Sequence, residues 1–101
     1  MRKEARKIVK RTIKPSEDIV ASMVEDFKKR LIKLIDQGIK DLTIDFKSVK
    51  NMDAAGLGIL IATYNSLEQC GGVLKLKNVS EDLSVLLKTM RLDQRFEVIT
   101  V

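Results

Sequence analysis

The side chains that commonly do acid–base, nucleophilic or metal chemistry are few and scattered in this sequence. Histidine, the usual general base and metal ligand, is absent. Cys70 is the only cysteine, so it lacks an imidazole to activate it and a second thiol for an internal disulfide. We expect it to be a partly buried, unreactive side chain at a helix end. The aspartates Asp36, Asp41, Asp45 and Asp53 fall in several predicted elements and do not form a metal-binding pattern. We therefore expect a protein that is not an enzyme and has no cofactor or metal.

The stretch from Asn51 to Gly58 is unusually rich in small residues. Gly56 and Gly58 could be mistaken for part of a phosphate-binding loop. However, the Gly-x-x-Gly-Lys spacing and its lysine are missing. We therefore expect no nucleotide site here.

Hydrophobic periodicity predicts an alternation of strands and helices that must position this stretch. Apolar residues three and four apart between residues 20 and 35 indicate a first helix. Ser22 and Glu25 fit a capping box for it, and Gly38 supplies its stop. Asp53 and Ser80 are natural N-caps for two further helices. The predicted strands lie near residues 8–13, 42–46, 74–77 and 96–99.

This order predicts the α/β fold class, in which crossovers between parallel strands are right-handed. A chain of 101 residues has room for one core. We therefore expect a single domain over residues 1–101, with residues 1–14 as a basic first strand or N-terminal segment.

The small-residue stretch resembles the signature of the STAS domain family. In that family a strand with an acidic end leads through a short loop to Asp-Ser-x-Gly-Leu/Ile-Gly. Here the chain reads Asn51-Met52-Asp53-Ala54-Ala55-Gly56-Leu57-Gly58, preceded by Leu42-Thr43-Ile44-Asp45-Phe46. Residues 71–76 and 86–98 also resemble later elements of the family, so the resemblance covers about residues 16–100. It implies a mixed four- to five-stranded sheet with three or four helices packed against it.

The resemblance also implies reversible protein–protein binding. In the bacterial anti-sigma-factor antagonists of this family, the domain binds an anti-sigma factor that is also a serine kinase. The kinase phosphorylates the hydroxyl residue directly after the signature aspartate, and binding is lost, because phosphate adds nearly two negative charges to the docking surface. We therefore expect a signalling module that regulates transcription by binding such a factor or a related regulatory complex.

This sequence departs from the family at the modified position. Ala54 follows the signature aspartate and Ala55 follows Ala54, and neither has a hydroxyl group. Ser48, Thr63 and Ser66 lie nearby in the sequence but do not occupy that position. Three interpretations stay open: a binder without a phosphorylation switch, a deliberate serine-to-alanine replacement, and a STAS scaffold in another assembly, such as a lipid-transport ABC complex.

The resemblance places the partner-binding surface on the loop before the second helix and on the start of that helix. The predicted contact residues are Ser48, Asn51, Met52, Asp53, Ala54, Ala55, Gly56 and Leu57. Glu17 and Asp18 match the family's acidic N-terminal turn loosely and are predicted as an accessory loop. The N-terminal part is shorter than the family's usual two strands. This leaves a sheet edge with which a partner or a second copy of the chain could pair, so a homodimer is a further expectation.

The positive charge of the chain is concentrated at its N-terminus. Residues 1–14 contain seven basic residues and one acidic residue, a net charge of +6, whereas the other 87 residues contain 12 basic and 13 acidic residues, a net charge of −1. Nucleic-acid binding through this segment is therefore an alternative, but the chain has few aromatic residues for base stacking. The single cysteine and the lack of long apolar stretches predict a cytoplasmic protein without a membrane span.

Overall fold

Strands and helices alternate along the chain as the periodicity predicts. The computed structural model describes residues 10–16, 18–92 and 94–99. The elements are β1 (Lys10–Ile13), α1 (Ala21–Asp36), β2 (Asp41–Asp45), α2 (Ala54–Gln69), β3 (Val73–Lys77), α3 (Glu81–Thr89) and β4 (Glu97–Ile99). The predicted α/β fold class is confirmed. Of the predicted N-terminal segment, residues 1–9 lie outside the described residues.

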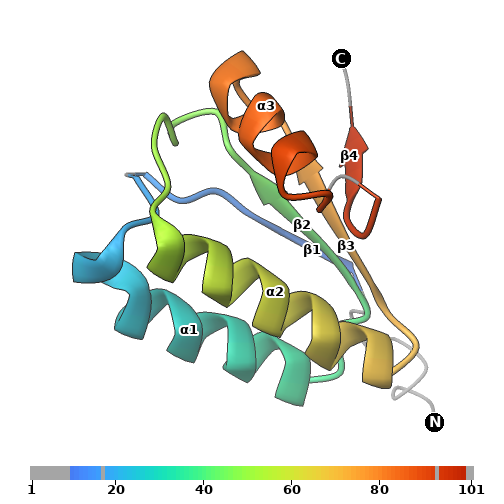
Figure 1. Cartoon of the computed structure of the whole chain (residues 1–101). Coiled ribbons are helices and arrows are strands. Elements are labelled where there is room, and N and C mark those ends of the chain that lie inside the picture. Colours follow the sequence, from blue (N-terminus) through green and yellow to red (C-terminus); the bar gives the residue numbers. More distant parts are fainter. Residues whose placement is uncertain (1–9, 17, 93, 100–101) are drawn as a thin grey trace, which may run out of the picture.

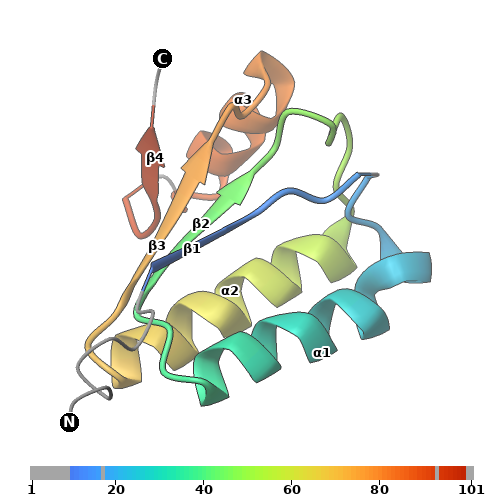
Figure 2. The same ribbon diagram turned by 180° about the vertical axis from the view of Figure 1, so that it is seen from behind.

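The described strands form one sheet in the order β1-β2-β3-β4, and each neighbouring pair is parallel. Each strand reaches the next through a helix, and such connections favour parallel pairing. The antiparallel pairing that a mixed sheet also needs is not found among the residues that the structure describes. Helices α1 and α2 lie side by side across one face of the strands (Figure 1), and the rear view places the strands in front of them (Figure 2).

The core lies between this face of the sheet and the helices. Leu42, Ile44, Leu74 and Leu76 alternate along β2 and β3 and are fully or almost fully buried. The helices contribute buried side chains at the predicted spacings of three and four, including Phe27, Leu31 and Leu34 from α1, Leu57, Leu60 and Leu67 from α2, and Leu83 and Leu87 from α3. Burial of this apolar surface fixes the positions of the loops at the strand ends.

Two of the three predicted helix caps are confirmed. One carboxylate oxygen of Asp53 accepts a hydrogen bond from the Gly56 N–H at 3.0 Å, and Ser80 Oγ accepts one from the Leu83 N–H at 3.2 Å. The predicted capping box of Ser22 and Glu25 is wrong. Helix α1 already begins at Ala21, after an extended Val20 that makes no side-chain cap bond, so Ser22 falls inside the helix instead of before it.

The predicted helix stop at Gly38 is confirmed, because this glycine has a φ of +96° directly after the helix cap at Gln37. The prediction that Cys70 is partly buried is wrong. Cys70 caps the C-terminal end of α2 and is exposed, together with its neighbours Gln69 and Gly71. This end of the helix faces solvent, because the last side chain of α2 to reach the core is Leu67.

Candidate functional site

The loop between β2 and α2, residues 46–53, lies at the carboxyl end of the sheet. Two of its three apolar residues anchor its first half: Phe46 and Val49 are each only 1% exposed. The Phe46 N–H donates to the Lys77 carbonyl, and the Val49 N–H donates to the Phe46 carbonyl, both at 2.9 Å. Ser48 and Lys50 are exposed on either side of Val49. The loop therefore presents polar side chains to solvent from a fixed base.

A second strand-like contact joins this loop to the segment that enters α1. Ile19 and Met52 form an isolated parallel bridge. In this bridge the Ile19 N–H donates to the Asn51 carbonyl at 3.2 Å, and the Asp53 N–H donates to the Ile19 carbonyl at 3.4 Å. Both bridge residues are buried, whereas Asn51 is exposed. The two chain segments meet in Figure 1 where the loop runs into the first turn of α2 beside the start of α1.

The Asp18 carboxylate also binds this loop. One of its oxygens accepts from the Lys50 N–H at 2.8 Å and from the Asn51 N–H at 3.1 Å. The other accepts from the Asn51 side-chain amide at 3.3 Å. The bond from the Lys50 amide, followed by those from Asn51, lowers the pKa of Asp18, because hydrogen bonds favour the charged carboxylate. The structure thus brings the predicted accessory residue Asp18 to the loop, while Glu17 lies outside the described residues.

The first turn of α2 places two alanines on the surface and one glycine in the interior. Ala54 and Ala55 are exposed, whereas Gly56 is buried. A Cβ atom at Gly56 would overlap the carbonyl oxygen of Ile19 and would lie 2.6 Å from Met52 Cγ. Glycine is required here because the helix start touches the backbone of another segment.

The eight predicted contact residues therefore divide into two groups. Met52, Gly56 and Leu57 are buried and position the segment. Ser48, Asn51, Asp53, Ala54 and Ala55 are exposed, and we refer to these five as the docking patch. Of the two other nearby hydroxyl residues, Thr63 is buried and donates to the Ile59 carbonyl at 2.8 Å, and Ser66 is exposed.

A second carboxylate, that of Asp45, also holds the loop, and the sequence analysis did not identify it. One carboxylate oxygen of Asp45 accepts from the Lys47 N–H and from the Asn78 side-chain amide, both at 2.9 Å. The Asn78 bond is the main cause of the lowered pKa of Asp45. Asn78 has a φ of +58°, a conformation that asparagine tolerates better than most residues. The only feature of the sequence that could have indicated this contact is an asparagine directly after a predicted strand.

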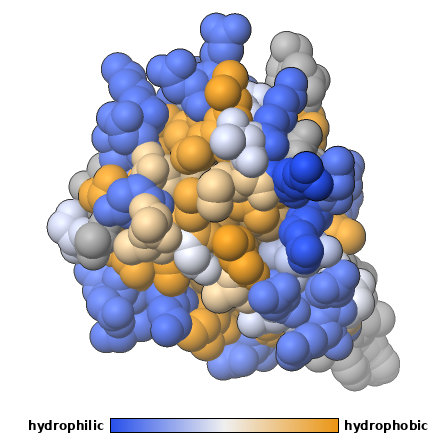
Figure 3. Space-filling view, in the orientation of Figure 1, coloured by the Kyte–Doolittle hydropathy of each residue, from blue (hydrophilic) through white to orange (hydrophobic). Residues whose placement is uncertain are grey.

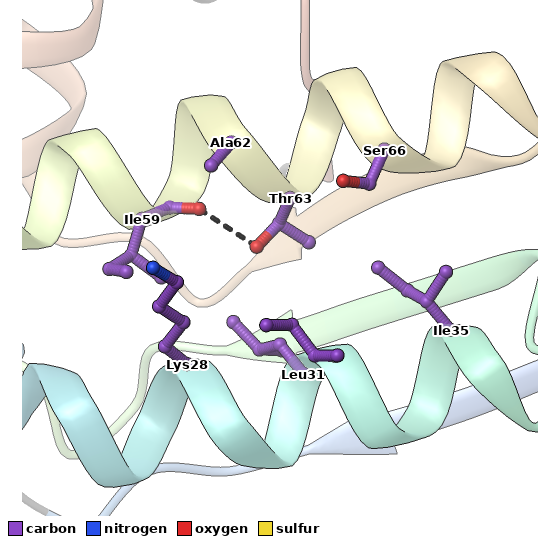
Figure 4. A pocket seen from close by; sticks show the side chains of 8 residues that line it. Lys28, Leu31, Ile35, Ile59, Ala62, Thr63 and Ser66 are labelled. Atoms are coloured by element: carbon purple, nitrogen blue, oxygen red, sulfur yellow. Dashed lines mark hydrogen bonds between the residues drawn. The ribbon is translucent and has the colours of Figure 1, made fainter.

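A shallow groove of about 110 Å³ lies between α1 and α2. Its lining is mostly apolar and consists of Lys28, Leu31, Ile32, Ile35, Ile59, Ala62, Thr63 and Ser66. Figure 4 shows Lys28, Leu31 and Ile35 reaching from α1 toward Ile59, Ala62 and Thr63 of α2, and Figure 3 shows apolar side chains gathered on this helical face. Pockets for small ligands commonly measure about 300–1,000 Å³, so the groove is too small for such a ligand.

The described residues contain no group of three or more Cys, Asp and Glu side chains that could hold a metal ion. Among the same residues, no helix has both the length and the apolar character needed to cross a membrane.

The model of the STAS domain matches residues 3–100. The chain belongs to the STAS domain family. The resemblance seen around Asp53 is confirmed across almost the whole chain.

This STAS domain is also similar to a curated relative, the anti-sigma-B factor antagonist of Bacillus subtilis (strain 168). The two are 43% identical over 56 residues, which are 55% of this chain and 50% of the relative. This chain therefore spans half the length of the relative that it matches.

Solved structures share the fold of this STAS domain at low sequence identity. The unphosphorylated form of the anti-sigma factor antagonist SpoIIAA matches with a TM-score of 0.75 and 18% identity, covering 92% of this chain and 81% of that one. A sulfate transporter family protein from Wolinella succinogenes matches with a TM-score of 0.76 and 21% identity, covering 93% and 81%. At such identities the likeness shows the fold alone.

Proposed function

We propose that this STAS domain is a non-catalytic, cytoplasmic docking domain that binds a kinase-type anti-sigma factor or a related regulatory protein. The observation that carries the proposal is the docking patch. Its five exposed residues stand on a loop and helix start that are held by Asp18, by the Ile19–Met52 bridge and by the Asp53 cap. A preformed surface loses little conformational freedom on binding and therefore suits protein recognition.

We further propose that this binding is independent of phosphorylation at the family's modified position. Ala54 occupies that position and has no hydroxyl group. A phosphate at the N-terminus of α2 would be held by free amides and the helix dipole and would place about two negative charges beside Asp53. Since alanine cannot accept phosphate, the patch stays in its unphosphorylated form.

The test pairs the wild-type chain with an Ala54→Ser variant. Each is mixed with the purified kinase-type anti-sigma factor from the same organism, with and without Mg-ATP. Calorimetry should show that both chains bind without ATP. Mass spectrometry should then show phosphate on the serine variant alone, with binding lost only for that variant.

Two results would overturn the proposal. One is failure of the wild-type chain to bind the factor at all. The other is ATP-dependent loss of wild-type binding, which would place a switch at another residue. Isolation of the chain with an ATPase and a permease would instead favour the transport assembly, and isolation with nucleic acid would favour the basic N-terminal segment.

A further inference from the structure

Building on the docking function proposed above, we propose that Asp18 is a positioning residue. Its carboxylate holds the β2–α2 loop in the shape that presents the docking patch, and it does not itself contact the partner. Asp18 lies 32 residues before Lys50 and outside the docking patch, so its influence on binding passes through the loop.

The carboxylate is committed to the loop by three hydrogen bonds. One oxygen accepts both backbone amides, from Lys50 at 2.8 Å and Asn51 at 3.1 Å, and the other accepts the Asn51 side chain at 3.3 Å. A carboxylate that accepts several N–H bonds is held in its charged form, in agreement with the lowered pKa of Asp18. Its acceptor sites are therefore directed at this chain instead of at a partner.

Few other hydrogen bonds of the described residues fix the part of the loop around Lys50 and Asn51. Lys50 and Asn51 are exposed, so their side chains are not held by burial. The backbone bonds of the neighbouring bridge, at 3.2 and 3.4 Å, are longer than the bond from the Lys50 amide to Asp18. Hydrogen bonds to a charged acceptor are also stronger than those between neutral groups. Asp18 is therefore the group best placed to fix Asn51 and, through Met52, the Asp53 cap.

Two variants separate positioning from direct contact. Asp18→Ala removes every acceptor. Asp18→Asn removes the charge but keeps an oxygen for both backbone amides, and a flip of the Asn51 side-chain amide lets its oxygen accept from the new amide. An acceptor role survives in the asparagine variant, whereas a charge-to-charge contact with a partner does not.

The first measurement uses the free chain and needs no partner. Amide hydrogen exchange at Lys50 and Asn51, followed by NMR, should become at least about tenfold faster in Asp18→Ala and stay within about threefold of wild type in Asp18→Asn. Unchanged exchange in Asp18→Ala would overturn the proposal. Because the full chain is used without a partner, this outcome does not depend on whether the proposed docking function is correct.

The second measurement is affinity for the kinase-type anti-sigma factor by calorimetry. Asp18→Ala should weaken binding by at least about tenfold, and Asp18→Asn should bind within about threefold of wild type. Equal losses in both variants, with slow exchange retained in Asp18→Asn, would overturn the proposal in favour of a direct contact by the charge. Wild-type affinity in Asp18→Ala would overturn it as well. Absence of binding by the wild-type chain would instead count against the docking function.

Discussion

Ala54 and Gly56 begin the same helix and are both small, yet the structure requires only one of them to be small. Gly56 is buried against the Ile19 carbonyl, where a Cβ atom cannot fit. Ala54 is exposed, so a larger side chain would extend into solvent. Close packing therefore explains why residue 56 is a glycine. The alanine instead leaves an uncharged, unmodifiable position at the centre of the docking patch.

Replacing the two glycines of α2 by alanine should change stability in opposite directions. Gly56→Ala should lower the free energy of unfolding by about 1–3 kcal/mol, because the added methyl group overpacks a backbone contact. Gly58→Ala is the matched control. Apart from its chain neighbours and the backbone of its own helix, no atom of the described residues lies within 4 Å of its Cβ position. This variant should therefore raise stability by about 0.5–1 kcal/mol through helix propensity. Urea denaturation measures both, and a stability gain in Gly56→Ala would contradict the close approach.

A negative charge at Ala54 should weaken partner binding without weakening the fold. An aspartate in the first turn of α2 interacts favourably with the helix dipole, so Ala54→Asp should be at least as stable as wild type. Its affinity for the anti-sigma factor should fall by more than about tenfold, because the docking patch gains a charge that must be desolvated. Calorimetry gives the affinity and thermal unfolding gives the stability.

The control places the same charge at the other end of the same helix. Gln69 is exposed in the last turn of α2, where an aspartate is slightly unfavourable to the helix. Gln69→Asp should nevertheless bind like wild type. Equal losses in the two variants would show that the helix start is not the interface.

At the scale of elements, the β2–α2 loop is shaped by carboxylates that belong to its neighbours. Asp18 precedes α1 and accepts the amides of Lys50 and Asn51. Asp45 ends β2 and accepts the amide of the loop's second residue, Lys47. Both carboxylates accept backbone amides, so both act best in their charged forms. The hydrogen bonds that hold the loop are therefore strongest when these two groups, which lie outside the docking patch, are ionised.

This dependence predicts a loss of stability in acid. The pKa values of Asp18 and Asp45 lie below the ordinary value of 3.8 in the folded chain. The hydrogen bonds therefore stabilise the fold above that value, and their contribution is lost as the pH falls through the lower folded-state pKa. Wild type should unfold at a higher temperature than Asp18→Asn at about pH 7, and the difference should shrink toward about pH 3. A difference that grows in acid would contradict the assigned direction.

Local sequence patterns predict the helices and strands well, but they do not predict the long-range hydrogen bonds that hold the loop. The spacing of Phe27, Leu31 and Leu34 along one helical stripe, and the alternation of Leu42 and Ile44, report which face meets the core, and both are local properties. The bond from the Lys50 amide to Asp18 joins residues 32 positions apart, and no periodicity encodes it. The capping box at Ser22 failed for a related reason, because the chain entering α1 is fixed by the Ile19–Met52 bridge instead of by a side-chain cap.

Family likeness predicted a contiguous stretch of contact residues, but only part of that stretch is exposed. Asn51, Asp53 and Ala54 were predicted as contact residues and lie on the surface, but Met52 and Leu57 were predicted in the same way and are buried. A strand-like bridge turns Met52 inward. Such a long-range contact is invisible in a single stretch of sequence.

At the scale of the whole molecule, the parallel sheet gives the domain two structurally different ends. The loops at the carboxyl ends of the strands carry the docking patch. The turns at the opposite end carry Gly38 and the Gly71–Gly72 pair. Helix α2 connects the two ends, and its 16 residues span roughly 24 Å. We therefore expect a partner that binds at the patch to leave the far end of α2 exposed.

The single cysteine provides a probe of this division. Cys70 is exposed at the far end of α2. Labelling it with a maleimide fluorophore should leave affinity for the anti-sigma factor within about twofold of the unlabelled chain, because the label lies well beyond contact range of the patch. Fluorescence anisotropy measures this, with a Cys70→Ala chain as the unlabelled control. A loss greater than tenfold would show that the interface extends along the whole helix.

The strict sequence order of the strands sets the order in which the site can be assembled during synthesis. Because β1, β2 and β3 are neighbours in the sheet in the order in which they leave the ribosome, each new strand has its pairing partner already synthesised. A nascent chain that has emerged through Gly58 already contains Asp18, Lys50 and both bridge residues. Asn78, which completes the Asp45 brace, arrives only after β3. The hydrogen bonds from Lys50 and Asn51 to Asp18 can therefore form during synthesis, before β3 and the Asn78 bond to Asp45 are available.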